Sequence, residues 1–376
     1  MKRDTAIDYL RSGVTVLVVA HHSGLAYNTF SRFNPAHYTA STAPVVDMSR
    51  WAPLDYLVAW NDIFFMALMF LISGLFVAPA LGRKGAGRFF SDRAKRLGIP
   101  FAIAVTLLMP LAYYPSWRLG DDADRGGYLR RFFTTDGWPV GPPWFLWLLL
   151  AFCALVAFAY WLAPRLWVRL AWQPTSAWGL AAVFLAASLV ATVPVRLFVP
   201  PYSWSSLGGP FAFQTSRLML YLVWFLLGVS LGGENLQRSL AVSNLRPWPL
   251  WLLLGLATFV AHWFFSGSAS LRSMPAWLGN GALAIVFTLC CAFTSLASLG
   301  AARSLARAPW PVAASLSENA YGIYILHYPF VTWMQFSLLS QPWPAALKFA
   351  IVFPLALAGS WVTTARLRRT AARRVL

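Results

Sequence analysis

Arg11–Leu25 reads RSGVTVLVVAHHSGL, an apolar stretch that begins with a cation and holds two adjacent histidines near its end. On an α-helix of about 3.6 residues per turn, Arg11 and His22 are about three turns apart and share one face, whereas His21 points about 100° away. Ionisable side chains at membrane depth are costly and by default indicate a functional site. The stretch therefore predicts a membrane-spanning helix that carries part of such a site.

The composition of the whole chain agrees with a membrane setting. Of 376 residues, 59% are hydrophobic and only 11% are charged, and the mean hydropathy is +0.58. Such values exclude an ordinary soluble domain. Because no long polar segment interrupts the chain, we expect residues 1–376 to form a single integral-membrane domain.

Apolar segments of spanning length recur from one end of the chain to the other. A membrane helix needs about 20 apolar residues, and a window of that length predicts an all-α polytopic bundle of about ten transmembrane helices. The predicted spans are residues 8–28, 56–80, 97–115, 143–163, 177–199, 215–232, 248–266, 276–299, 316–338 and 344–364.

The net charge of +18 is explained by topology rather than by nucleic-acid binding. Lysine and arginine accumulate in cytoplasmic loops, and a cytoplasmic N-terminus places most of the 30 Lys and Arg residues inside. Both termini are then predicted to be cytoplasmic. Two long outer segments, 29–55 and 115–142, are expected either to cap an outward-facing acceptor site or to act as solvated tethers.

The second informative stretch is Phe70–Pro100, which is expected to leave the membrane at Pro79 and to return at Leu97. Its cations fit either a positive-inside loop beside anionic lipid or a docking surface for phosphate groups, because arginine forks match phosphate oxygens. Arg93 and Arg96 are three residues apart and would share a helical face.

The three cysteines do not indicate a disulfide framework or a metal site. Cys153, Cys290 and Cys291 all lie in apolar stretches without metal-like spacing. The N-terminus begins like a secretory signal, but charged residues and the paired histidines interrupt it, and it is expected to remain as an uncleaved first span.

Five sequence blocks together resemble the membrane-bound acyltransferase family 3. The blocks are Arg11 with His22 in the first span, FFMALMFLISGLF followed by RKGAGRFFSDRAKRLGIP, PPWFLWLLLAF, FQTSRLMLYLVWFLLGV and ENAYGIYILHYPF. The similarity runs in the expected order from Ile7 to about Trp361 and is strongest to a branch similar to glucan biosynthesis protein C.

The resemblance implies a ten-helix enzyme of the bacterial inner membrane. Such an enzyme takes an acyl group, here acetyl or succinyl, from cytoplasmic acyl-CoA and delivers it to a hydroxyl of a periplasmic or lipid-linked carbohydrate. His22 matches the family's essential histidine and Arg11 the arginine of the same motif. Arg93 and Arg96 match the paired-arginine motif of the acyl-CoA side, and Arg88 of the same basic segment is added as a further phosphate contact.

Those residue types suit acyl transfer. A neutral imidazole can remove the proton of an attacking hydroxyl near neutral pH, or His22 can act as a nucleophile and form an acyl-imidazole. Asp62 in the second span is the predicted orienting acid for His22, with capping of the second helix as the alternative. His327, Tyr324 and His21 are secondary candidates.

The sequence names neither the acyl group nor the acceptor. We expect no permanently bound cofactor and no metal. The expected partners are membrane lipid, acyl-CoA as donor and a carbohydrate or lipid-linked saccharide as acceptor, with no nucleic acid and an open oligomeric state. The rival class is a transporter or flippase of a lipid-linked saccharide, which would need a similar bundle but no acyl donor.

Overall fold

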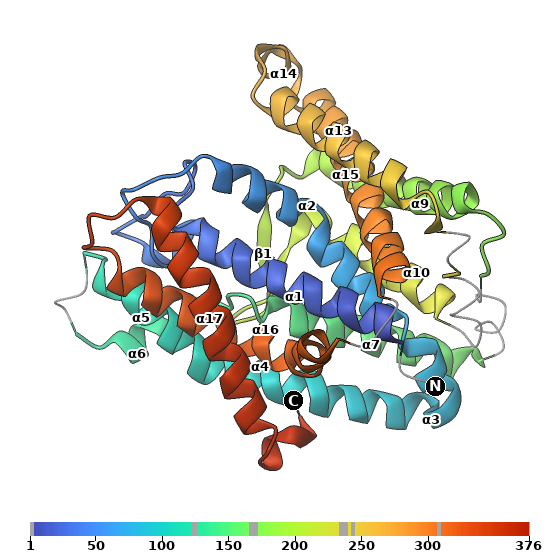
Figure 1. The fold of residues 1–376 in the computed structure, drawn as a ribbon, viewed down its shortest axis with the longest axis horizontal. Coiled ribbons are helices and arrows are strands. Elements are labelled where there is room, and N and C mark those ends of the chain that lie inside the picture. Colours follow the sequence, from blue (N-terminus) through green and yellow to red (C-terminus); the bar gives the residue numbers. More distant parts are fainter. Residues whose placement is uncertain are drawn as a thin grey trace.

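A computed structural model describes residues 4–121, 126–164, 172–232, 240–241, 245–306 and 310–375, without the side chain of residue 374. The described chain is a bundle of α-helices with one antiparallel hairpin, β1 (Trp204–Ser206) and β2 (Ala212–Gln214). Figure 1 shows the long helices packed side by side, with α1 crossing the middle of the bundle.

Each predicted span coincides with a helix. The long helices are α1 (Thr5–Leu25), α2 (Pro53–Gly74), α7 (Trp144–Leu162), α9 (Ala177–Phe198), α10 (Leu218–Leu231), α13 (Trp248–Ser266), α15 (Ala276–Leu305), α16 (Pro311–Ser337) and α17 (Ala345–Leu367). The third span lies within one continuous helical stretch, Val77–Arg118. Seven helices in the described part of the chain are long and apolar enough to cross a membrane. The all-α polytopic bundle is thus confirmed.

Two predicted spans, α1 and α16, are not among those seven, and α10 is apolar but shorter. α1 carries charged and imidazole side chains, and α16 carries several polar residues that are buried in the protein. A helix that is enclosed by other helices need not be apolar all round, because its polar groups face protein rather than lipid. The lower apolarity of α1 and α16 therefore reflects their place in the bundle.

The basic stretch after α2 differs from the expected loop. Its residues are helical: α3 (Val77–Arg93), a π-helix (Ala94–Gly98), α4 (Ile99–Ile103), a second π-helix (Ala104–Leu108) and α5 (Met109–Arg118). Only Gly85 leaves helical geometry, with φ of 71°, which glycine adopts without steric cost. The cations of this stretch are therefore held on a helix.

The remaining elements are short. They are α6 (Tyr128–Phe133), α14 (Ala269–Ser273) and the 3₁₀ turns Tyr38–Ala40, Thr215–Arg217 and Ala371–Arg374.

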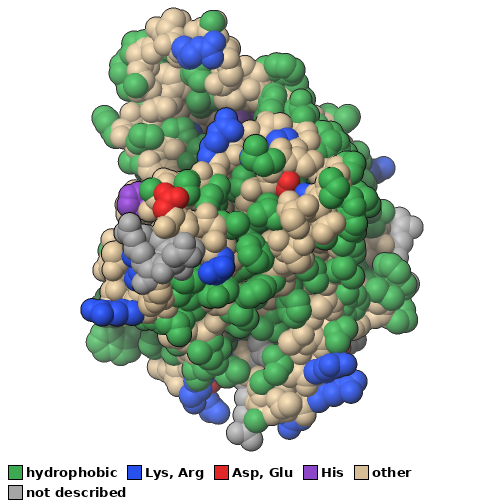
Figure 2. Space-filling view, turned by 90° about the vertical axis from the view of Figure 1, so that its left-hand side faces the viewer, with side chains coloured by type: hydrophobic (Ala, Val, Ile, Leu, Met, Phe, Trp, Pro, Cys, Tyr) green, Lys and Arg blue, Asp and Glu red, His purple; other side chains and the backbone are tan. Residues whose placement is uncertain are grey.

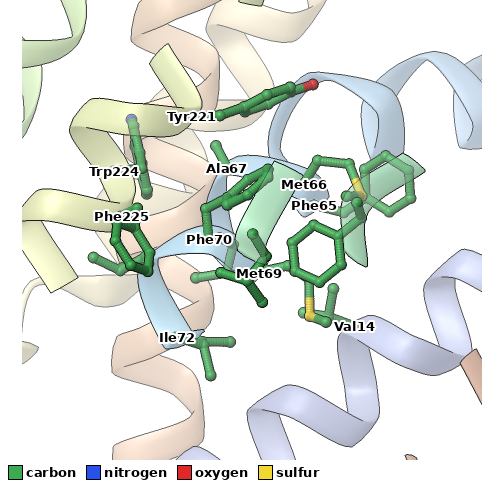
Figure 3. Packing of buried hydrophobic residues seen from close by; sticks show 14 of the residues in the cluster. Val14, Phe65, Met66, Ala67, Met69, Phe70, Ile72, Tyr221, Trp224 and Phe225 are labelled. Atoms are coloured by element: carbon green, nitrogen blue, oxygen red, sulfur yellow. The ribbon is translucent and has the colours of Figure 1, made fainter. Parts of the chain in front are cut away.

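α2 forms the apolar centre of the molecule between α1 and α10. Figure 3 shows Phe70 of α2 beside Tyr221 and Phe225 of α10, with Val14 of α1 on the opposite side. The Phe70 and Tyr221 rings stack with centroids 5.0 Å apart. The two helices nearly touch at Gly74, where an added Cβ would lie 2.2 Å from the carbonyl oxygen of Phe225.

The predicted outer end carries an ordered segment, residues 26–52, rather than a solvated tether. Asp55 accepts hydrogen bonds from the backbone and hydroxyl of Thr29 at 2.7 and 2.6 Å. Asp47 forms a buried ion pair of 2.6 Å with Lys348 of α17. Figure 2 looks at this end of the molecule, where hydrophobic side chains cover much of the surface between separate Lys and Arg clusters.

Candidate active site

Helices α1 and α16 run side by side, and polar contacts at both ends fix their register. Near the cytoplasmic end of the predicted topology, Arg11 donates to the carbonyl of Ser317 at 3.3 Å, and the Ser317 hydroxyl donates to the carbonyl of Asp8 at 3.1 Å. At the other end, the Gln335 amide donates to the carbonyl of His22 at 3.0 Å. This register brings His22 opposite His327.

The imidazoles of His22 and His327 form a direct pair. The His327 Nε2 lies 3.1 Å from the His22 Nδ1, and the His327 Nδ1 lies 2.7 Å from the carbonyl oxygen of Tyr324. The rings are 5.0 Å apart between centroids. His327 is fully buried, so its partners decide where its proton lies.

Those partners assign the tautomers of a neutral pair. A carbonyl oxygen only accepts, so the His327 Nδ1 carries the proton and its Nε2 has the lone pair. The His22 Nδ1 must then be the donor, shared between His327 and the carbonyl of Val18 at 2.9 Å. The His22 Nε2 consequently keeps a lone pair, and no described residue hydrogen-bonds to it. Such a nitrogen is suited to accept a proton.

His21 faces away from this pair, as its place in the helix predicts. Its ring stacks on Phe65 at 5.2 Å and meets the His22 ring edge-on at 5.3 Å. Tyr328 meets the His22 ring edge-on from another side at 5.1 Å. Aromatic rings thus surround His22 and fix its orientation.

A cavity of about 300 Å³ lies between α1, α2, α3, α7 and α16, and arginines gather in its wall. It unites the predicted donor-side residues Arg11, Arg93 and Arg96 with Arg373 of the C-terminal segment. Its apolar wall comes from Met69, Ile72, Phe76, Leu97, Phe145 and Leu149. A cationic rim over an apolar wall suits a ligand with an anionic head and an uncharged tail.

Pro100 explains how Arg96 is placed. Proline has no N–H and clashes with the carbonyl four residues earlier, so the helix widens into a π-turn at Ala94–Gly98. The carbonyl of Arg96 is thereby released from the helix, and the Tyr321 hydroxyl of α16 donates to it at 2.5 Å. The same replacement recurs at Pro115, where Trp333 donates to the carbonyl of Leu111 at 2.9 Å.

Tyr324 links the cavity to the histidine pair. It lines the cavity, donates to the carbonyl of Pro142, and lies with its ring 6.1 Å from that of His327. Thr15 of α1 also lines the cavity and lies two turns before His22, a rise of roughly 10 Å. Thr15 and Tyr324 thus bring the cavity wall to within about two helical turns of the histidine pair, although neither histidine lines the cavity.

The expected contact between Asp62 and His22 is wrong. Asp62 pairs instead with Arg217, which donates to its carboxylate at 2.5 Å and to its carbonyl at 2.6 Å. α1 directs His22 towards α16, and it is His21 that lies on the α2 side, beside Phe65. The partner that contacts His22 is His327, which the sequence offered only as a secondary candidate.

Arg88 is exposed on α3 and does not line the cavity. Two lining residues, Tyr321 and Arg373, were not expected. Tyr321 lies one turn from Tyr324 in the ENAYGIYILHYPF block, so helical spacing could have indicated it. Arg373 belongs to the basic C-terminal tail, and no local pattern distinguishes it from its neighbours.

Comparison with known proteins yields one match. Residues 4–365 match the family model described as an acyltransferase domain, so the match includes both helices of the histidine pair and the Arg93–Arg96 segment. No curated protein and no solved structure matches the chain.

Proposed function

The chain belongs to this acyltransferase family, and from that premise we propose that it is an acyl-CoA-dependent O-acyltransferase of an envelope carbohydrate. The observation that supports the proposal is the His22–His327 pair, which leaves a lone pair on the His22 Nε2. On α1, His22 lies about two helical turns beyond Thr15, a residue in the wall of the arginine-lined cavity. The proposed acyl group is acetyl or succinyl, and the proposed membrane is the bacterial inner membrane. The resemblance to the glucan branch favours a periplasmic glucan as acceptor.

The cavity supports the donor side of the proposal. Coenzyme A carries phosphates at one end and a thioester at the end of an uncharged arm. Arg93, Arg96 and Arg373 would bind the phosphates at the exposed rim, and Arg11 lies farther along the wall. The arm would then follow the apolar wall past Tyr324 towards His22.

The chemical step follows from the tautomer. The acceptor hydroxyl attacks the thioester carbonyl while the His22 Nε2 takes its proton, and the new C–O ester bond replaces the C–S bond. The leaving thiolate receives that proton from the imidazolium, which regenerates neutral His22 and free CoA. His327 accepts from the His22 Nδ1–H throughout and stabilises the transient imidazolium.

The first experiment measures transfer of radiolabelled acetyl or succinyl groups in membranes. We expect His22→Ala to lower transfer by about 10²–10⁴-fold, the usual contribution of a general base. His37→Ala is the matched control, because His37 is exposed in the outer segment. Undiminished transfer by His22→Ala at equal expression refutes the mechanism.

A second experiment separates the enzyme from a saccharide transporter. Acyl-CoA should raise the thermal unfolding temperature of the purified protein, and free CoA should do so less if the acyl arm contributes. Arg93→Gln should weaken this effect, and exposed Arg88→Gln should not. A protein that ignores acyl-CoA at saturating concentration is not an acyl-CoA-dependent enzyme.

A further inference from the structure

A second group of buried charges lies on the other side of His21, away from the cavity. It consists of Arg196 at the end of α9, Arg217 just before α10, and Asp62 of α2. The two arginines flank one aromatic ring, that of Phe287 on α15, with guanidinium carbons 5.6 and 4.9 Å from its centroid. Both are almost wholly buried, with exposures of 2% and 3%.

The charges of this group do not balance. Asp62 supplies one carboxylate, and Arg217 binds it directly at 2.5 Å. The Arg196 guanidinium has no hydrogen bond or ion pair with any described residue, and the Nε atoms of Arg196 and Arg217 are both buried without a partner. Phe287 supplies a π face to Arg196 but no hydrogen-bond acceptor. A second guanidinium is therefore enclosed without an anion.

Burial of a guanidinium without an anion is unfavourable unless a ligand supplies the missing negative charge. Buried charges in proteins are paired, because removing an ion from water without compensation is strongly unfavourable. The chain follows this rule elsewhere: Lys348 is equally buried and pairs with Asp47 at 2.6 Å. Other titratable groups within electrostatic range of the two arginines include Tyr202, Tyr221 and His262. None of these three is an anion at neutral pH, so Asp62 supplies the one negative charge among these described groups.

The backbone conformation of Tyr202, which lies over this group, supports the presence of a binding site. Tyr202 covers Arg217, with its ring 5.5 Å from the guanidinium carbon, and has a φ of 64°. A non-glycine residue pays conformational strain in this left-handed region and keeps it only where its surroundings impose it. Tyr202 is itself exposed, and it therefore separates the arginines from the surface at the predicted outer end.

We propose that Arg196 and Arg217 form a binding site for a phosphate oxyanion at the predicted outer end of the bundle. Arg217 keeps its contact with Asp62 and offers its Nε, while Arg196 offers its whole guanidinium fork. The oxyanion arrives either on a soluble molecule or as the headgroup of an anionic lipid. The site lies beyond His21 and goes beyond the acyl-transfer chemistry.

The test measures thermal unfolding of the full-length protein with and without defined anions. Inorganic phosphate is the soluble probe, and nanodiscs of phosphatidylcholine with or without phosphatidylglycerol are the lipid probe. One of the two probes should raise the unfolding temperature of the wild type, and the probe that does so identifies the source of the oxyanion. The compared variants are Arg196→Gln, Arg196→Lys and, as control, Arg272→Gln, which changes an exposed arginine of α14.

Arg196→Gln should bind the effective anion at least about tenfold more weakly, because charged hydrogen bonds are lost. Without anion it should be as stable as the wild type or more so, since an uncompensated charge is gone. Arg196→Lys should keep part of the shift, and Arg272→Gln all of it. The proposal is overturned if neither anion stabilises the wild type, or if Arg196→Gln keeps the full shift. Because the readout is binding, failure of this site leaves the His22 test unaffected.

Discussion

At the scale of single residues, the site depends on which atoms can only accept a hydrogen bond. The carbonyl of Tyr324 orients His327, and His327 in turn directs the proton of His22 to Nδ1. In the proposed mechanism, the His22 Nε2 is thus prepared by a residue that need not touch the substrate. His327 would act as a positioning residue, and its effect should appear in the chemical step rather than in donor binding.

We expect His327→Ala to lower kcat by about tenfold or more, yet less than the loss of about 10²–10⁴-fold expected for His22→Ala. The KM for acyl-CoA should stay nearly unchanged, because the cavity wall does not include His327. His327→Gln retains an acceptor and should recover part of the rate. Steady-state kinetics in membranes checks this, and an unchanged kcat in His327→Ala would refute the positioning role.

Tyr38, which lies outside the predicted spans, is a second residue whose protonation depends on its hydrogen-bond partner. Tyr38 donates to Asp136 at 2.7 Å and joins the two outer segments. Burial, together with this hydrogen bond, raises the pKa of Tyr38, so the phenol remains a donor throughout the physiological range. The contact therefore does not depend on pH near neutrality.

At the scale of elements, small residues and prolines decide how the helices meet. α2 and α10 approach so closely that a Cβ at Gly228 would lie 2.2 Å from the carbonyl oxygen of Leu71. α16 is joined to the α3–α5 stretch by aromatic donors that bind carbonyls released by Pro100 and Pro115. Close packing and hydrogen bonds therefore hold these helices together, because hydrophobic attraction between helices is weak in lipid.

Gly228→Ala should lower stability by about 1–3 kcal/mol, the usual cost of overpacking, because the opposing atoms are backbone and cannot move aside. Gly13→Ala is the control, since no atom lies within 4 Å of its added Cβ. Thermal unfolding of the purified proteins measures both. Equal unfolding temperatures for Gly228→Ala and wild type would contradict the close approach.

Tyr321→Phe should weaken acyl-CoA binding several-fold, because loss of one hydrogen bond is worth about 1 kcal/mol and the Arg96 backbone loses its only side-chain donor among the described residues. The turnover rate at saturating donor should remain. Tyr56→Phe, at an exposed position of α2, is the matched control. Titration with acyl-CoA decides, and equal affinities in the two variants would remove Tyr321 from the donor site.

At the scale of the whole molecule, the two ends of the bundle are different. The arginine-lined cavity, which we propose as the donor site, lies near the α3 and C-terminal end, and the Arg196 group lies near the opposite end with Tyr202 and the hairpin. His22 stands between them on α1.

The topology can be tested by cysteine labelling in intact cells. Met48→Cys, at a position 91% exposed in the outer segment, should react with a membrane-impermeant maleimide. Arg83→Cys, exposed on α3, should react only after the cells are opened. The native cysteines are all buried and give a low background. The opposite pattern would invert the predicted orientation.

The outer segment should depend on one buried ion pair. Asp47→Ala leaves Lys348 buried without its partner and is expected to destabilise the protein by about 3–5 kcal/mol. Asp92→Ala removes the exposed partner of Lys84 and should change stability little, because water screens exposed pairs. Thermal unfolding compares the two variants. A small effect of Asp47→Ala would show that the outer segment does not rely on this pair.

The sequence by itself determined the positions of the helices and the shared face of Arg11 and His22, because hydropathy and helical periodicity are local properties. The three-residue spacing also predicted that Arg93 and Arg96 share one helical face. Only the tertiary structure decided that His22 meets His327, that Asp62 binds Arg217, and that Arg373 joins the arginine-lined cavity. These contacts join distant parts of the chain, and they depend on which faces the helices turn towards one another. Helical spacing alone leaves that packing choice open.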